Sequence, residues 1–201
     1  MTRWYREKKR EHYYKQAKKD GYRARSAYKL KQINKKYNLI KNGDIVVDLG
    51  AAPGGWSQIT KKIIGPNGKI VGVDILKIKP IEKITFIKGD MTKSETIDEI
   101  IENLNGKYAD VIISDMSPDI SGNYDVDHAR SIFLCQMALE TSKKILKENG
   151  NFLCKVFDGR DLEDFIKDLK DNFSFVKRFS PQASRKSSSE LYLIAKDFYK
   201  N

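Results

Sequence analysis

The feature that most constrains the fold of this chain is a small-residue run at positions 48–56, Asp-Leu-Gly-Ala-Ala-Pro-Gly-Gly-Trp. It follows an apolar run at 45–47 that is typical of a buried parallel strand. The glycines in the run allow positive φ angles and let a ligand approach the main chain without meeting a Cβ atom. Asp48 stands at the carboxyl end of the strand, where open α/β sheets bind ligands. The sequence therefore predicts a strand, a ligand-binding turn and a helix.

Beyond this turn, apolar runs alternate with helical patterns along the chain. Such alternation is typical of an α/β fold built around a mostly parallel sheet. A helical pattern also precedes the first strand, from Arg23 to Tyr37, with Asn42-Gly43 as its expected end. We expect further helices at 56–64, 92–105, 128–146 and 161–171, and further strands at 69–73, 84–87, 109–114, 151–157, 173–179 and 191–195.

Aspartates follow the first four expected strands at positions 48, 74, 90 and 115. The carboxyl ends of parallel strands meet at one edge of a sheet, so these side chains are expected to line one site. Asp74 lies at the tip of the second strand, where an acidic residue accepts hydrogen bonds from ribose hydroxyls. The loop at 119–127 contains a glycine and is expected to be mobile, and His128 is expected to be a polar residue in the first turn of its helix.

Lys155 interrupts an otherwise apolar strand, Phe152-Leu153-Cys154-Lys155-Val156-Phe157. Burial of an unpaired ammonium group is costly, so this lysine is expected to be paired or functional. Lys29 and Glu190, by contrast, would pass for ordinary surface charges if each were considered alone.

Positive charge is concentrated at the amino terminus. Residues 1–41 hold 15 Lys and Arg against 3 Asp and Glu, whereas residues 42–201 hold 23 against 24. Six aromatic residues are interleaved with these cations, as expected where phosphates are neutralised and bases are stacked. We interpret residues 1–21 as a basic aromatic arm that contacts nucleic acid. The aromatic residues are Trp4, Tyr5, Tyr13, Tyr14, Tyr22 and Tyr28.

The remaining 22–201 segment has the length of a single domain. No apolar run approaches the roughly 20 residues that a membrane-spanning helix needs, and the amino terminus does not resemble a signal peptide, so we expect a cytoplasmic protein. Cys135 and Cys154 lack metal-ligand spacing and are expected to be small core residues, with no metal site.

Four separated motifs occur together: the run at 48–56, Ser114-Asp115-Met116-Ser117-Pro118, Lys155-Val156-Phe157, and the serine-rich loop that ends at Glu190. In this order they resemble the FtsJ/RrmJ (RlmE) family of ribosomal RNA 2′-O-ribose methyltransferases over about residues 22–196. The resemblance implies a Rossmann-like class I fold, with a seven-stranded, mostly parallel sheet, helices on both faces and an antiparallel last strand. It places the catalytic tetrad of the family on Lys29, Asp115, Lys155 and Glu190. With Asp48 and Gly50 of the turn, the expected S-adenosylmethionine contacts are Gly54, Trp56, Asp74, Asp90 and Asp115.

The expected activity is transfer of a methyl group from S-adenosylmethionine to a ribose 2′-hydroxyl, with S-adenosylhomocysteine as the product. The resemblance implies a uridine of large-subunit (23S) ribosomal RNA as the target, free or in the assembled subunit, and a monomer that acts on RNA and not on DNA. Lys155 is the candidate general base or alkoxide stabiliser, because burial and the second cation Lys29 would favour its neutral amine. Asp115 and Glu190 are expected to orient the ammonium groups and the hydroxyl.

Other functions remain open to different degrees. A nicotinamide oxidoreductase would share the strand, the turn and Asp74, but the turn lacks the G-x-G-x-x-G spacing. A P-loop NTPase is excluded because no Gly-Lys-Ser/Thr follows the glycines. A noncatalytic RNA-binding protein of ribosome assembly on the same fold is the main alternative from another class. Methylation of a tRNA anticodon loop or of an mRNA cap is the alternative among enzymes.

Overall fold

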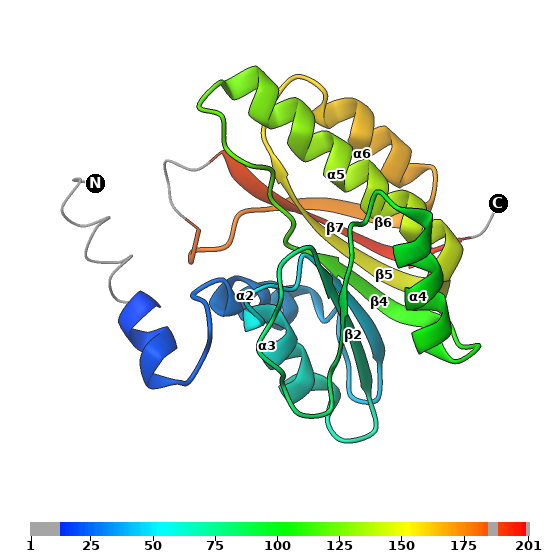
Figure 1. Ribbon diagram of the computed structural model, residues 1–201. Helices are drawn as coiled ribbons and strands as arrows, with labels where there is room; N and C mark the ends of the chain where they lie inside the picture. Colours follow the sequence, from blue (N-terminus) through cyan, green and yellow to red (C-terminus); the bar gives the residue numbers. More distant parts are fainter. Residues whose placement is uncertain (1–12, 185–188, 200–201) are drawn as a thin grey trace.

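The computed structural model describes residues 13–184 and 189–199. Within these residues, seven strands form one sheet and helices pack against both of its faces (Figure 1). Residues 13–19 are also helical, whereas residues 1–12 of the expected basic arm lie outside the described part of the chain. In chain order the elements are α2 (Ala27–Tyr37), β1 (Ile45–Leu49), α3 (Gly55–Ile64), β2 (Lys69–Asp74), β3 (Thr85–Lys88), α4 (Ser94–Leu104), β4 (Ala109–Ser114), α5 (Tyr124–Ile145), β5 (Leu146–Phe157), α6 (Leu162–Lys170), β6 (Phe173–Phe179) and β7 (Glu190–Phe198).

The strand order is β3-β2-β1-β4-β5-β7-β6. The pairs among β1 to β5 are parallel, and β7 runs antiparallel to both β5 and β6. The strand order reverses between β1 and β4, and a reversal of this kind opens a ligand crevice at the carboxyl ends of the strands. The predicted fold class, including the antiparallel last strand, is confirmed.

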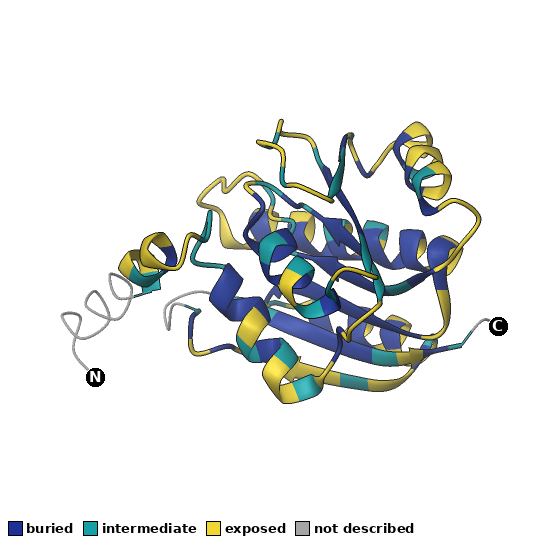
Figure 2. Ribbon diagram, turned by 90° about the horizontal axis from the view of Figure 1, so that it is seen from below, coloured by how far each residue is buried: buried dark blue, intermediate teal, exposed yellow. Residues whose placement is uncertain are grey.

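Each face of the sheet has its own hydrophobic core. One core contains Leu30 of α2 and Ile59 of α3, packed on residues such as Val46 and Ile113. The other core lies beneath α4, α5 and α6 (Figure 1). Because successive residues of a strand point to opposite faces, each strand divides its apolar residues between the two cores. Figure 2 shows the central strands buried along most of their length and many exposed residues on the helices, whereas the edge strand β6 is largely exposed.

The largest differences from the sequence expectation occur at three boundaries. The helix before β1 ends at Tyr37, because Asn38 adopts a left-handed conformation with φ 49°. Helix α5 begins at Tyr124 and not at 128, because the side chain of Asn123 accepts hydrogen bonds from two backbone N–H groups of its first turn. Strand β5 begins at Leu146, which pairs with Ala109 before the register shifts.

Cys135 and Cys154 are both buried in the core beneath α5, as expected. No helix in the described residues is long and apolar enough to cross a membrane.

Candidate active site at the carboxyl edge of the sheet

The predicted catalytic residues come from four separate segments that meet on one face of the sheet. Asp115 follows β4, Lys155 lies on β5, Glu190 begins β7 and Lys29 lies on α2. Alternation along the strands directs these side chains toward the face covered by α2 and α3. The fold therefore brings together residues that are up to 161 positions apart in sequence.

Lys155 is held by Asp115 in two ways. Its Nζ atom donates a hydrogen bond of 2.6 Å to the backbone carbonyl of Asp115 and lies 3.2 Å from Oδ1 of the same residue. Lys155 is 6% exposed, so its ammonium group has little contact with solvent. The sequence expectation that this lysine would be paired is confirmed.

A second lysine–carboxylate pair joins α2 to the start of β7. Lys29 Nζ donates a hydrogen bond of 2.9 Å to Glu190 Oε2. Lys29 is also 6% exposed, although it lies in a helix that carries many surface lysines. Burial distinguishes Lys29 from those lysines, and nothing in the sequence pattern of the helix does.

Tyr192 connects the two pairs, and sequence reasoning missed it. Its hydroxyl donates a hydrogen bond of 3.1 Å to Asp115 Oδ1, and Lys29 Nζ lies 5.6 Å from the centre of its ring. Burial, with Asp115 as the next cause, raises the pKa of Tyr192 well above its usual value, so the phenol remains a donor. The only sequence signal was its place two residues after Glu190, on the same side of β7.

The glycine-rich turn is shaped by close packing. Gly50 has φ 75°, and a Cβ atom there would lie 2.7 Å from the side chain and 2.9 Å from the backbone of Met116. Gly54 has φ 108°, and its Cβ would lie 3.0 Å from Ile81 and 3.2 Å from Arg23. Both positions therefore need glycine, because their φ angles are positive and a side chain would clash with these neighbours.

Asp48 is fully buried, and only one of its two carboxylate oxygens has a hydrogen-bond partner in the described part of the chain. Its Oδ2 accepts a hydrogen bond of 2.6 Å from the Ser57 hydroxyl, whereas Oδ1 has no hydrogen-bond partner among the described residues. Burial raises the pKa of this carboxyl to about 7, an effect that the carboxylates of Asp115 and Asp74 reinforce. An unpartnered buried oxygen at a glycine-rich turn fits a ligand that supplies a cationic donor.

Asp74 and Asp90 lie at the next two strand ends. Asp74 Oδ2 accepts from the backbone N–H of Ala52 at 2.8 Å, and Oδ1 accepts from that of Leu76 at 2.8 Å. The carboxylate thus joins the turn to the loop after β2 and retains free lone pairs for a hydroxyl donor. Asp90 is exposed, and hydrogen bonds from the Thr92 backbone and hydroxyl lower its pKa.

Trp56 faces inward. Its indole Nε1 donates a hydrogen bond of 2.9 Å to the carbonyl of Ser26, and its ring centre lies 5.8 Å from that of Tyr192. It therefore packs α3 against the start of α2 and against Tyr192, and a contact between Trp56 and the cofactor stays a prediction.

Arg23 is a further residue that the sequence did not single out. Its guanidinium group donates hydrogen bonds to the carbonyls of Pro53, Lys79 and Pro80, the last at 2.9 Å. Its backbone N–H donates to Gln58 Oε1 at 2.8 Å. Arg23 thereby fastens the loop after β2 against the glycine-rich turn.

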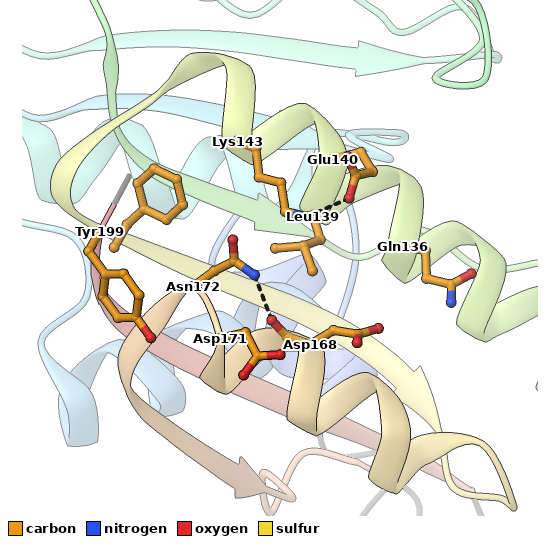
Figure 3. A pocket seen from close by; sticks show the side chains of 9 residues that line it. Gln136, Leu139, Glu140, Lys143, Asp168, Asp171, Asn172 and Tyr199 are labelled. Atoms are coloured by element: carbon orange, nitrogen blue, oxygen red, sulfur yellow. Dashed lines mark hydrogen bonds and ion pairs between the residues drawn. The ribbon is translucent and has the colours of Figure 1, made fainter. Parts of the chain in front are cut away.

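A separate surface hollow lies between α5, α6 and the end of β7 (Figure 3). It contains the Glu140–Lys143 ion pair and the hydrogen bond from Asn172 to the Asp168 carbonyl. None of the predicted site residues lines it. Across residues 13–184 and 189–199, no group of three or more His, Cys, Asp or Glu side chains is placed to hold a metal ion.

Comparison with known proteins identifies the family. A family model described as FtsJ-like methyltransferase matches residues 22–198. The chain is 53% identical over 190 residues to ribosomal RNA large subunit methyltransferase E of Methanosarcina acetivorans, covering 94% of this chain and 69% of that protein. It is 47% identical over 192 residues to the protein of that name from Halobacterium salinarum, covering 94% of this chain and 74% of the relative.

Solved structures agree with this assignment. A Plasmodium falciparum protein assigned as a ribosomal RNA methyltransferase has a TM-score of 0.82 and 30% identity, covering 90% of this chain and all of that one. Aeropyrum pernix fibrillarin, solved with S-adenosylmethionine bound, shares the fold with a TM-score of 0.53 at 17% identity, covering 78% of this chain and 68% of that one. This chain belongs to the FtsJ-like methyltransferase family.

Proposed function

We propose that this protein transfers the methyl group of S-adenosylmethionine to a ribose 2′-hydroxyl of RNA, and that the target is a uridine of large-subunit ribosomal RNA. The observation that carries the proposal is the arrangement of two buried lysine–carboxylate pairs, joined by Tyr192, at the sheet edge that also holds the glycine-rich turn. The family supplies the reaction class, and the relatives named as large-subunit methyltransferases support the substrate.

The cofactor supplies an electrophilic methyl group on a sulfonium, and the residues at the turn fit it. Asp48 offers a buried carboxylate oxygen for the ammonium group of the methionyl part. Asp74 offers a carboxylate for the ribose hydroxyls, and Asp90 lies farther along the same edge, toward the adenine. Gly50 and Gly54 let the turn pack closely against Met116, Ile81 and Arg23, which sets its backbone conformation.

The tetrad handles the hydroxyl and its proton. A ribose hydroxyl is a weak nucleophile, so holding it in line with the methyl group supplies much of the acceleration. Lys155, fixed by Asp115, is placed to stabilise negative charge as it develops on the 2′-oxygen, or to accept the proton if its amine is neutral. Lys29 and Glu190 add a second oriented pair. Tyr192 holds Asp115 in position.

RNA is the favoured substrate for two reasons. DNA lacks the 2′-hydroxyl that this chemistry needs. In addition, the described helix at 13–19 exposes Lys15, Lys18 and Lys19, which continue the basic arm that begins at the amino terminus. The proposal therefore includes phosphate contact by residues 1–21, a methyltransferase domain at 22–201, and a monomer that acts in the cytoplasm.

The test is incubation of the pure protein with methyl-labelled S-adenosylmethionine and, separately, unmethylated large-subunit rRNA, large ribosomal subunits and tRNA. Label on the rRNA or the subunit is the expected result. Label confined to tRNA would redirect the proposal to the anticodon loop. Bound cofactor with no label on any RNA would support a noncatalytic RNA-binding role and contradict the proposed activity.

A further inference from the structure

We propose that Tyr124, together with Ile120, forms a platform on which the base of the target nucleotide stacks while its ribose is methylated. The platform lies in the segment between β4 and α5, directly after the predicted catalytic Asp115. This inference rests on the proposed function, because it concerns how the RNA substrate is held at the same site.

The segment that carries the platform makes several hydrogen bonds, both within itself and to the first turns of α5. Asp127 accepts hydrogen bonds from the backbone N–H of Ser121 at 2.8 Å, from its hydroxyl at 2.7 Å and from the N–H of Gly122 at 3.2 Å. The Asn123 side chain caps α5, and Arg130 donates to the carbonyl of Asp119. Side chains on this segment are therefore presented in a defined position.

The platform residues are large, apolar and exposed. Ile120 is 64% exposed and Tyr124 is 57% exposed. Single exposed apolar residues are common on protein surfaces and need no explanation. Two of them on a segment held by this many hydrogen bonds, which follows the predicted catalytic Asp115 in the chain, are better explained by an apolar ligand surface. The Tyr124 hydroxyl donates to the carbonyl of Asp158 at 2.5 Å, which fixes the ring while leaving it largely exposed.

Tyr124 is also linked by hydrogen bonds to the segments that carry proposed tetrad residues. The residue that accepts its hydrogen bond, Asp158, follows β5 and donates its own N–H to the Ser189 carbonyl at 2.8 Å. Ser189 precedes Glu190, and Glu190 pairs with Phe157 in the sheet. Figure 1 shows the start of α5 at the same end of the molecule as the start of β7. Two hydrogen bonds in series, through Asp158 and Ser189, thus link Tyr124 to the start of β7.

The chemistry of the substrate fits this surface. Every base has an aromatic face that can stack on a tyrosine ring, and an aliphatic side chain can pack against the same base. A base held in this way restricts rotation of its ribose, and the 2′-hydroxyl is thereby presented to Lys155. The ligand implied is one unpaired nucleotide turned out of its helix or loop.

The test compares Tyr124→Ala and Tyr124→Phe with wild type, using unmethylated large-subunit rRNA or large subunits, whichever wild type methylates. Tyr124→Ala should raise KM for the RNA on the order of 10- to 100-fold, the usual effect of removing one stacking aromatic. Its dissociation constant for S-adenosylmethionine and its melting temperature should stay near wild type. Tyr124→Phe keeps the ring and should stay within about threefold of wild type.

Tyr108→Ala is the matched control. Tyr108 is 51% exposed and precedes β4, at the opposite edge of the sheet. Its replacement should leave KM for the RNA unchanged.

Three results would overturn the platform. An unchanged RNA KM in Tyr124→Ala shows that no base stacks there. An equal defect in Tyr124→Phe, with a lowered melting temperature, assigns Tyr124 a structural role through Asp158. Weakened cofactor binding in Tyr124→Ala assigns it to the cofactor. If the wild-type protein itself labels no ribose, the proposed function fails first and the platform fails with it.

Discussion

At the scale of single residues, the proposed chemistry depends on the pair formed by Lys155 and Asp115. Removal of the lysine eliminates the proposed general base or alkoxide stabiliser, which contacts Asp115. The hydrogen bonds of Asp48 and Asp74, two other carboxylates proposed to bind the cofactor, go to Ser57, Ala52 and Leu76 instead. We predict that Lys155→Ala lowers kcat by at least about 10³-fold, within the range expected for a positioned acid–base or electrostatic group. Single-turnover methylation measures this, and calorimetry should show an S-adenosylmethionine affinity close to wild type.

Lys147→Ala is the control for that variant. Lys147 lies on the same strand and pairs with the aspartate Asp110, but at the far end of β5. It should retain wild-type kcat. Equal activity of the Lys155 and Lys147 variants would contradict the assignment of Lys155 to the tetrad.

Asp48 predicts a pH dependence of stability. Its carboxyl has a pKa of about 7 in the folded protein and near 3.8 when unfolded. Below pH 3.8 both states hold the proton; between the two values only the folded state holds it, so the free energy of unfolding falls as pH rises toward about 7. Asp48→Asn lacks this titration. The melting temperature of the variant minus that of wild type should therefore rise between about pH 5 and pH 8. An unchanged difference would contradict the raised pKa. The same variant should bind S-adenosylmethionine more weakly.

At the scale of elements, the site depends on segments that are held together by side chains. Arg23 joins the glycine-rich turn to the loop after β2 through carbonyls on both. Asp74 makes a second connection between the same two segments. We infer that these contacts fix the entrance through which the cofactor reaches the turn.

We therefore predict that Arg23→Ala weakens S-adenosylmethionine binding by roughly 10-fold, since each hydrogen bond from a charged group contributes about 1.5–3 kcal/mol and only a small part is transmitted to the ligand. Amide hydrogen exchange in residues 75–81 should accelerate in the same variant. The control is Arg178→Ala. Arg178 is an exposed arginine on β6, at the other edge of the sheet, where it pairs with Glu163. Unchanged exchange at 75–81 would mean that Arg23 does not fasten this loop.

The elements themselves were largely predictable, because apolar periodicity records which residues face a core. Strands such as Ala109–Ser114 and Phe173–Phe179 have the predicted limits. The start of β5 at Leu146 was not predictable, because pairing with Ala109 continues the strand through a stretch with turn-forming residues. Of the proposed tetrad, Lys155 could be selected as a candidate because it interrupts an apolar strand. Lys29 and Glu190 could be selected only through the family resemblance. The roles of Tyr192 and Arg23 depend on contacts between distant segments, which no local pattern encodes.

At the scale of the whole molecule, the excess of positive charge and most of the proposed catalytic residues lie in different parts of the chain. The positive net charge comes from the first 41 residues, whereas the proposed catalytic residues other than Lys29 lie in the remaining chain. An arm of this kind contacts phosphates in a sequence-independent manner, and it releases counterions when RNA binds.

Replacing Lys15, Lys18 and Lys19 with Gln should weaken RNA binding at low salt and reduce the slope of log Kd against log salt by about 0.7 per lost phosphate contact, the value for single strands. Filter binding across a salt series measures both. Lys143, Lys144 and Lys167, on the helices α5 and α6, supply a control triple with the same charge change. Equal slopes for the two triples would show that the amino-terminal lysines do not contact RNA.

The central claim is that the acceptor is a ribose hydroxyl activated at Lys155, and alkaline hydrolysis tests it most directly. A 2′-O-methyl group blocks cleavage at its own phosphodiester bond. RNA labelled by the wild-type protein should therefore release the label in alkali-resistant dinucleotides, and Lys155→Ala should produce almost none. Label recovered in mononucleotides would place the methyl group on a base, and normal dinucleotide label from Lys155→Ala would remove Lys155 from the chemistry; either result would contradict the account.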